Sequence, residues 1–230
     1  MIDQFAFHIS EVSGIGEVRD LLEKISSERR TQISRFRFET DKMRSLFAEV
    51  LLRYALKKRY GIEDLVLKTN EYGKPFLKDH EEIFFNLSHS GDWVVCGIGD
   101  RNLGIDVERI EDIEMSIARD FFAKEEWEYI RTIPETERLG VFYRVWTLKE
   151  CYTKNVGKGM SIPLDSFYFA FSEARIDIHV QGVRSTDYTF QTRDLDDRHK
   201  LALCVSSEEG KNIDSAFTVV SLEEIRAEIL

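Results

Sequence analysis

The sequence predicts an α+β fold, because two long helical segments are each followed by short runs that alternate like strands. The first helical segment covers residues 40–61 and ends at Gly61, and the second covers residues 142–157 and ends at Gly157. Hydrophobic residues make up 43% of the 230 residues and aromatic residues 12%, which is ample for a buried core. We therefore expect a globular protein of one large domain or two small ones.

The first part of the chain contains the strongest helix signal, residues 40–61, where Thr40 or Asp41 can cap the helix and apolar residues recur at helical spacing. The other elements expected here are a strand at 1–10, a helix at 17–37, a turn at 70–75, and strands at 83–87 and 93–97 around a Ser-His-Ser-Gly turn.

The second part of the chain is expected to form the long helix that ends at Gly157, preceded by a loop that ends at Pro134. The other elements expected here are a strand at 103–108, a helix at 116–130, strands at 161–171, 187–191, 201–206 and 217–220, and a helix at 222–229.

Composition excludes several classes of protein. No apolar run reaches the roughly 18 residues that span a bilayer, and the start MIDQFAFHIS lacks the features of a secretory signal, so we expect a cytoplasmic protein without membrane contact. Three cysteines in apolar or helical contexts, Cys96, Cys151 and Cys204, indicate buried thiols rather than disulfides or a zinc site.

Charge is spread unevenly along the chain. The formal net charge of −10 argues against nucleic-acid binding, yet the segment from Arg29 to Arg59 holds ten Lys or Arg against three Asp or Glu. A solvated helix face would account for this basic segment, and so would attraction of an anionic cofactor or an acidic partner.

Two carboxylates lie close together on one predicted strand. Asp106 and Glu108 are two residues apart in an apolar run, so both side chains point to the same side of the strand. Adjacent acids repel unless a cation lies between them, and hard oxygen ligands suit Mg²⁺ completed by a substrate phosphate, with Mn²⁺ as an alternative ion. The other interpretation is the solvated face of an edge strand.

Trp146, Glu150 and Lys154 recur every four residues, which places an aromatic side chain, an acid and a base along one face of the second long helix. Glu150 and Lys154 could instead be an ordinary surface ion pair worth only about 0.2–0.5 kcal/mol, and Trp146 could be a core residue.

Five motifs, in this order and spacing, resemble the signature of the 4′-phosphopantetheinyl transferases, and more narrowly of their surfactin-synthetase-activating type. The motifs are Gly73-Lys74-Pro75, Phe85-Asn86-Leu87-Ser88-His89-Ser90-Gly91, Gly104-Ile105-Asp106-Val107-Glu108, Phe121-Phe122-Ala123, and Trp146-Thr147-Leu148-Lys149-Glu150 followed by Lys154. The similarity runs from about residue 28 to residue 159, more than half of the chain. Each motif alone is weak evidence, and the five together are strong.

The resemblance implies two similar α/β halves that form a pseudo-dimer, with the cofactor site in the cleft between them. The expected halves are residues 1–104, on the side of the coenzyme A 3′-phosphate, and residues 105–230, with the metal and the catalytic helix. A chain built in this way has less need to dimerise, so we expect a monomer.

The resemblance also implies an activity. The enzyme would transfer 4′-phosphopantetheine from coenzyme A to a serine of an apo acyl- or peptidyl-carrier protein, and 3′,5′-ADP would leave. Asp106, Glu108 and Glu150 would hold Mg²⁺, and Lys154 would stabilise or protonate the leaving phosphate. The general base stays open between Glu150, Glu126 and a water on the metal.

Coenzyme A contacts are implied for seven residues: Arg29, Arg44, Lys74, Ser88, His89, Asp106 and Lys154. Lys74 and His89 are expected on loops. The sequence departs from the family pattern at Gln32, where close relatives have a lysine, so one phosphate contact is in doubt and Arg30 is a candidate substitute.

A contact with the carrier protein is expected around Phe121, Phe122 and Trp127, with at least one of the two phenylalanines in the core and Trp127 as the better exposed candidate. Two other functions stay open. The chain could bind coenzyme A or a carrier protein without catalysis, or it could be a metal-dependent phosphatase.

Overall fold

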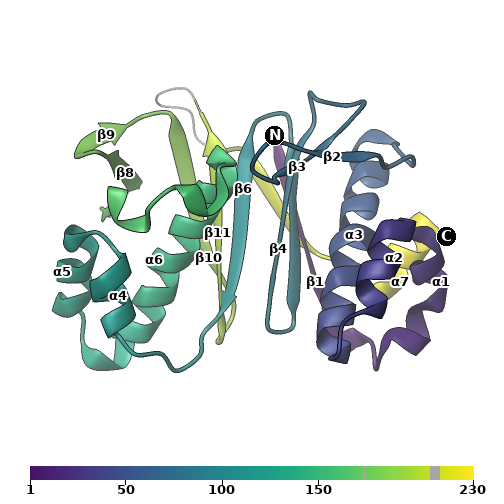
Figure 1. Ribbon diagram of the computed structural model, residues 1–230, viewed down its shortest axis with the longest axis horizontal. Helices are drawn as coiled ribbons and strands as arrows, with labels where there is room; N and C mark the ends of the chain where they lie inside the picture. The colour runs from purple at the N-terminus through teal and green to yellow at the C-terminus, as the bar shows by residue number, and fades with distance from the viewer. Residues whose placement is uncertain (173–174, 208–212) are drawn as a thin grey trace.

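The computed structural model describes residues 1–172, 175–207 and 213–230, and its architecture confirms the predicted α+β class. Helices flank a central group of strands on both sides, so that the molecule has two lobes (Figure 1). Strands β4 (Phe84–Ser90) and β6 (Leu103–Arg109), one from each lobe, stand side by side in the middle. This junction is where the polar residues of the site gather.

The first sheet has the strand order β12-β1-β5-β4, built from β12 (Ser215–Val219), β1 (Ile2–His8), β5 (Trp93–Gly99) and β4. β1 runs parallel to β12 and antiparallel to β5, and β4 runs antiparallel to β5. The C-terminal strand therefore returns to the first lobe, and helix α7 (Leu222–Ile229) follows it there. A single cut at 104/105 does not separate the lobes, since residues 215–229 pack with the first.

The second sheet has the antiparallel order β10-β11-β6, with β10 (Tyr188–Asp196) and β11 (His199–Ser206). Helix α6 (Glu135–Val156) lies against one face of this sheet. The helix comes so close to β6 that a Cβ atom on Gly104 would lie 2.0 Å from the carbonyl oxygen of Cys151. Gly104 therefore allows the contact that brings α6 down onto the strand with the acids.

Helix α3 (Glu39–Tyr60) covers the outer face of the first sheet, as the apolar spacing predicts. Phe47 stacks on Phe7 of β1 with 4.0 Å between ring centroids. The helix ends at Gly61, whose φ of 68° gives the left-handed cap, and α6 ends in the same way at Gly157 with φ of 75°. Both predicted helix stops are confirmed.

The remaining elements are short. The helices are α1 (Arg19–Lys24), α2 (Ser27–Ser34), α4 (Ser116–Phe121) and α5 (Lys124–Thr132). The 3-10 turns are Ile9–Glu11, Ile15–Val18, Gly159–Ser161 and Leu164–Ser166. The strands are β2 (Leu67–Thr69), β3 (Pro75–Leu77), β7 (Phe167–Phe171), β8 (Ile176–Val180) and β9 (Val183–Ser185).

Several predicted boundaries are wrong. The helix expected at 17–37 is broken at Ile25, which is buried in an extended conformation, and Ser26 then caps α2 by accepting the N–H of Arg29. The helix expected at 116–130 is broken in the same way at Phe122. The strand expected at 161–171 begins only at Phe167, after two 3-10 turns.

The core extends through both lobes and joins them. Alternate residues of β5 face α3 or the second sheet, and on the second side Val95 packs with Ile105 and Leu203. Cys96, Cys151 and Cys204 are free, buried thiols, as predicted. Across the described part of the chain, none of the helices has the length and apolar character needed to cross a membrane.

Candidate active site

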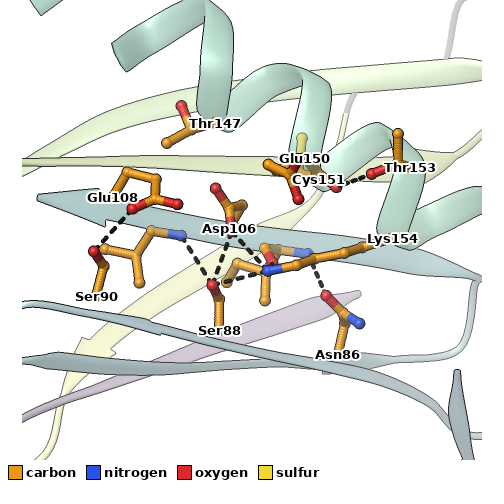
Figure 2. Close-up of polar contacts among 12 residues, drawn as sticks. Asn86, Ser88, Ser90, Asp106, Glu108, Thr147, Glu150, Cys151, Thr153 and Lys154 are labelled. Carbon is orange, nitrogen blue, oxygen red and sulfur yellow. Dashed lines mark hydrogen bonds and ion pairs between the residues drawn. The ribbon is translucent and has the colours of Figure 1, made fainter. Parts of the chain in front are cut away.

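The predicted acids and the predicted helix face meet at the junction of the lobes. Asp106 and Glu108 lie on the face of β6 that is turned toward α6, and Glu150 and Lys154 approach them from that helix (Figure 2). Ser88 and Ser90 of β4 reach the same carboxylates from the other lobe. The strand alternation and the four-residue spacing thus bring these residues together as the sequence predicts.

The shortest contact in the site joins Lys154 to Asp106. Nζ of Lys154 lies 2.6 Å from Oδ1 of Asp106, and it also donates to Oγ of Ser88 at 2.9 Å. Asp106 is only 2% exposed, and its second oxygen, Oδ2, has no hydrogen-bond partner among the described residues. A buried carboxylate oxygen without a donor is costly, so this atom is suited to a ligand that brings positive charge.

The negative charges of the carboxyl groups in the site are only partly balanced by positive charge from the protein. Burial raises the pKa of Asp106 despite the charge of Lys154. Burial and the charge of Asp106 raise the pKa of Glu108 to about 7, and the same two causes raise the pKa of Glu150. Three carboxyl groups thus share one ammonium group, and an additional cation would reverse these shifts.

The described residues do not form a metal cage in advance. Among residues 1–172, 175–207 and 213–230, no group of three or more His, Cys, Asp or Glu side chains has the arrangement that holds a metal ion. The donors have the right chemistry for a hard divalent cation, since all are carboxylate oxygens and Oδ2 of Asp106 is free. The chemical type of these ligands therefore suits such an ion. In this structure the carboxylates of Asp106, Glu108 and Glu150 do not converge on one point.

Arg44 of α3 and His89 of β4 form a second group of nitrogen donors, beside the turn between β4 and β5. Arg44 donates from Nη1 to the carbonyl oxygen of Gly91 at 2.9 Å and from Nη2 to Asp41, and its buried Nε has no partner in the part of the chain that the structure describes. Burial and the charge of Arg44 lower the pKa of His89. His89 lies within β4 rather than on the expected loop, and strand alternation turns it away from its buried neighbour Ser88.

Lys74 is placed on a loop, as expected, but its ammonium group is already engaged. Nζ donates to Oδ1 of Asn102 at 2.8 Å, to the carbonyl oxygen of Asn155 at 3.0 Å and to that of Leu103 at 3.2 Å. Burial lowers the pKa of this ammonium group to about 8. Lys74 therefore ties the end of α6 to the start of β6, beside a cavity of about 440 Å³ that it lines with Asn155.

Arg29 lies on α2 and is not joined to the Asp106–Lys154 cluster by any contact that the described residues make. Its Nε is 3.6 Å from the buried carboxylate of Glu49, which also accepts from Arg53. Arg29 and Gln32 line a separate cavity of about 390 Å³. Arg30, the candidate substitute for the missing lysine, donates to the carbonyl oxygen of Glu23.

Comparison with known proteins identifies the family. The family model described as the 4′-phosphopantetheinyl transferase superfamily matches residues 102–204, and the model described as 4′-phosphopantetheinyl transferase, N-terminal, matches residues 16–98. The 4′-phosphopantetheinyl transferase Sfp of Bacillus subtilis is 34% identical over 204 residues, which are 87% of this chain and 89% of that protein. The chain belongs to the 4′-phosphopantetheinyl transferase superfamily.

Two further similarities accompany this result. The 4′-phosphopantetheinyl transferase gsp of Aneurinibacillus migulanus is 35% identical over 186 residues, 80% of this chain and 77% of that protein. A solved holo-[acyl-carrier-protein] synthase of Thermotoga maritima has 21% sequence identity and a TM-score of 0.39, covering 47% of this chain and 64% of that one. The family models and the similarity to Sfp confirm the predicted family, and the chain is an enzyme of this transferase type.

In this phosphopantetheinyl transferase, Glu126 is poorly placed to act as the general base. Its side chain and that of Lys149 are both 0% exposed and form an ion pair of 2.7 Å. Glu126 also accepts the backbone N–H groups of Ala123 and Phe169, and Lys149 donates to two carbonyl oxygens of the segment that leads into β7. A fully buried carboxylate with these partners holds α5, α6 and β7 together and has no access to a substrate.

The aromatic residues near α4 differ from the expectation. Phe122 is in the core, as predicted for at least one of the pair, and Phe121 is 58% exposed. Trp127 is half-buried against the cluster around Phe142, so the better exposed residue is Phe121 and not Trp127. Trp146 is half-buried against the same cluster, with 5.9 Å between its ring centroid and that of Phe142, and its hydrogen bond to Glu108 places it at the edge of the site.

Reasoning from sequence did not give a role to two residues of β4 beside the site, one that contacts an acid and one that only joins the strands. Asn86 and Ser90 contact β6 directly, and Ser90 donates to Glu108 at 2.8 Å. Their signal was the alternation of Asn86, Ser88 and Ser90 with apolar Phe85 and Leu87. A polar face at this point predicts a polar partner, although the sequence does not say which one.

Proposed function

We propose that this enzyme transfers 4′-phosphopantetheine from coenzyme A to a serine hydroxyl of an apo acyl- or peptidyl-carrier protein and releases 3′,5′-ADP. The observation that carries the proposal is the buried contact of Lys154 with Asp106 at the junction of the lobes, beside Glu108, Glu150 and Ser88. Names of relatives such as Sfp support the same reaction.

The chemistry is a phosphoryl transfer. The serine oxygen bonds to the β-phosphorus of coenzyme A, the bond from that phosphorus to the oxygen of the 3′,5′-ADP group breaks, and the serine proton passes to a base. In such reactions the protein mainly positions the reactants and compensates developing charge. Lys154 supplies an ammonium group that can stabilise or protonate the leaving phosphate.

Glu150 is the side chain best suited to accept the serine proton. Burial and the charge of Asp106 raise its pKa while no cation is bound, and coordination to Mg²⁺ would lower it again, so in the metal-bound site Glu150 would take the proton through a water. Glu126 is excluded from this role by its burial and its ion pair with Lys149.

Asp106, Glu108 and Glu150 are the residues that would hold Mg²⁺, or Mn²⁺ in its place. When bound, the ion would compensate the charge of the coenzyme A pyrophosphate. The free Oδ2 of Asp106 and the raised pKa values of the three carboxyl groups support this assignment. The chain's own contribution is a rigid pair of acids on β6 and a third acid on the facing helix.

The 3′-phosphate of coenzyme A is assigned to Arg44 and His89. His89 lies near the end of β4 and Arg44 of α3 contacts the turn that follows it, and the Nε of Arg44, which has no partner among the described residues, leaves a donor for an anion. Lys74 and Arg29 support this assignment less strongly, because their cationic groups already have partners. For either residue to bind phosphate, the cofactor must displace those partners.

The carrier protein is assigned to the surface around Phe121, which takes the place of Trp127. An exposed aromatic side chain beside charged residues has the pattern of an interface anchor within a polar rim. Phe121→Ser should raise the KM for the carrier protein while the KM for coenzyme A stays the same. Equal KM values for the carrier in both proteins would place docking elsewhere.

Intact-mass analysis of an apo carrier protein tests the proposed reaction. After incubation with the enzyme, coenzyme A and Mg²⁺, the carrier should gain the mass of one phosphopantetheine group. A carrier whose acceptor serine is replaced by alanine should gain nothing. Release of inorganic phosphate from coenzyme A without a change in the carrier would instead indicate a phosphatase.

A further inference from the structure

Strands β4 and β6 are joined across the lobes by side chains of β4. Asn86, Ser88 and Ser90 lie on one face of β4, two residues apart. Each accepts a backbone N–H group of β6: Ile105 donates to Oδ1 of Asn86 at 2.9 Å, Val107 to Oγ of Ser88 at 3.3 Å, and Arg109 to Oγ of Ser90 at 3.0 Å. Figure 2 shows these three residues in a row along the strand. They form a polar ladder between the lobes.

The ladder supplies hydrogen-bond acceptors to the edge of β6 that no neighbouring strand of the described chain pairs with. β6 is the last strand of its sheet and pairs with β11 on one side only, so N–H groups on its other side need acceptors. β4 is likewise the last strand of its own sheet. Side-chain oxygens from β4 fill the missing positions without merging the two sheets into one.

The two serines of the ladder also donate hydrogen bonds. A hydroxyl group can accept and donate at the same time. Ser88 donates to Oδ1 of Asp106 and Ser90 donates to Oε2 of Glu108, both at 2.8 Å. Each serine therefore accepts the N–H of one β6 residue and donates to the carboxylate of the residue before it.

The ladder has serine where the preceding residue of β6 is an acid, and asparagine where it is not. Asn86 accepts from Ile105, and the residue before Ile105 is Gly104, which has no side chain to contact. The two serines stand where the preceding residue of β6 is an acid. An amide satisfies the backbone at the first position, so joining the strands does not by itself require a hydroxyl group. The hydroxyl groups occur at the two positions that contact a carboxylate.

We propose that Ser90 is a positioning residue, which fixes the carboxylate of Glu108 against the lobe junction, and that Asn86 is the member of the same ladder that joins the strands without touching an acid. The inference rests on the proposed function, because it takes Glu108 as part of the site for the transferred group. Ser90 acts through Glu108 and has no contact with the reacting atoms in this assignment.

Steady-state kinetics of matched variants test the proposal. Ser90→Ala removes the donor to Glu108 and should lower kcat about tenfold or more, since hydrogen bonds to charged groups contribute strongly, while the KM for coenzyme A changes less than about threefold. Ser90→Thr keeps a hydroxyl group and should restore kcat. Asn86→Ala removes only a contact between the strands, so it should lower the melting temperature and leave kcat within about threefold of wild type.

A spectroscopic measurement makes the test independent of activity. The ¹³C resonance of the Glu108 carboxyl group, assigned with Glu108→Gln, should shift in Ser90→Ala at fixed pH and stay in place in Asn86→Ala. An unshifted resonance in Ser90→Ala, or equal losses of kcat in Ser90→Ala and Asn86→Ala, would overturn the positioning role. If wild type transfers nothing, the proposed function fails, and the resonance still decides whether Ser90 holds Glu108.

Discussion

Nζ of Lys154 lies 2.6 Å from Oδ1 of Asp106, and the other oxygen of that carboxylate has no partner within the part of the chain that the structure describes. The two residues come from different elements, α6 and β6, and Ser88 of the other lobe contacts both of them. The negative charge at Oδ1 is thus balanced by the ammonium group of Lys154, and Oδ2 is left for a ligand. This division of one carboxylate underlies the predictions for the site.

Lys154→Ala should reduce turnover on the order of 10²–10³-fold, the loss seen when one preorganised donor to a developing charge is removed. An ordinary surface pair between Glu150 and Lys154 would predict less than about a threefold change. The rate of carrier modification at saturating coenzyme A distinguishes the two. Lys58→Ala, on the exposed end of α3, is the matched control and should keep the full rate.

Lys74 should make the free energy of unfolding depend on pH in the alkaline range. Its pKa is lowered from 10.5 to about 8 in the folded protein, so between these values the unfolded chain binds a proton that the folded chain has lost. Stability from this group is therefore complete above the unfolded pKa and is lost as pH falls through about 8. The free energy of unfolding in urea, relative to Lys74→Met, should rise from about pH 7.5 to about pH 10. A constant difference would mean that the ammonium group is not buried.

The ion pair of Glu126 and Lys149 should be structural. Glu126→Ala leaves a buried ammonium group without its partner and should cost about 3–5 kcal/mol of unfolding free energy. The double variant Glu126→Gln, Lys149→Met removes both charges and should recover much of that loss together with transfer activity. A double variant that is stable and inactive would return Glu126 to the list of candidate bases.

Arg44→Ala should weaken binding of coenzyme A about 10–100-fold, as expected for loss of a charged hydrogen-bond donor, and should have little effect on dephospho-coenzyme A, which lacks the 3′-phosphate. Calorimetric dissociation constants for the two ligands give the comparison. Arg59→Ala, at the other end of α3 and paired with Asp3, should change neither value. Equal losses for both ligands would remove Arg44 from the phosphate site.

Local patterns predicted the parts of this molecule that depend on nearby residues. The two long helices, their glycine ends, the alternation that pairs Asp106 with Glu108, and the face shared by Glu150 and Lys154 all follow from spacing. The break at Ile25 was missed because burial of that residue against the first lobe outweighed local helix preference.

Partners distant in sequence could not be predicted in this way. Lys74 contacts Asn155, which is 81 residues away, and Trp93 donates to Asp196 across 103 residues. The return of β12 to the first sheet is of the same kind, since its alternation indicates a strand and not which strand it joins. The engaged ammonium of Lys74 and the polar ladder both result from how the lobes pack.

Intact mass of an apo carrier protein, measured after incubation with wild type or with Asp106→Asn under the same conditions, decides between the site assigned here and any other. Both proteins should be folded, as circular dichroism would show, because the amide group of the variant keeps the shape of the carboxyl group that it replaces. Wild type should add one phosphopantetheine group to each carrier molecule, and Asp106→Asn should add none that can be detected. An unmodified carrier with wild type, or equal modification by both proteins, would contradict the account.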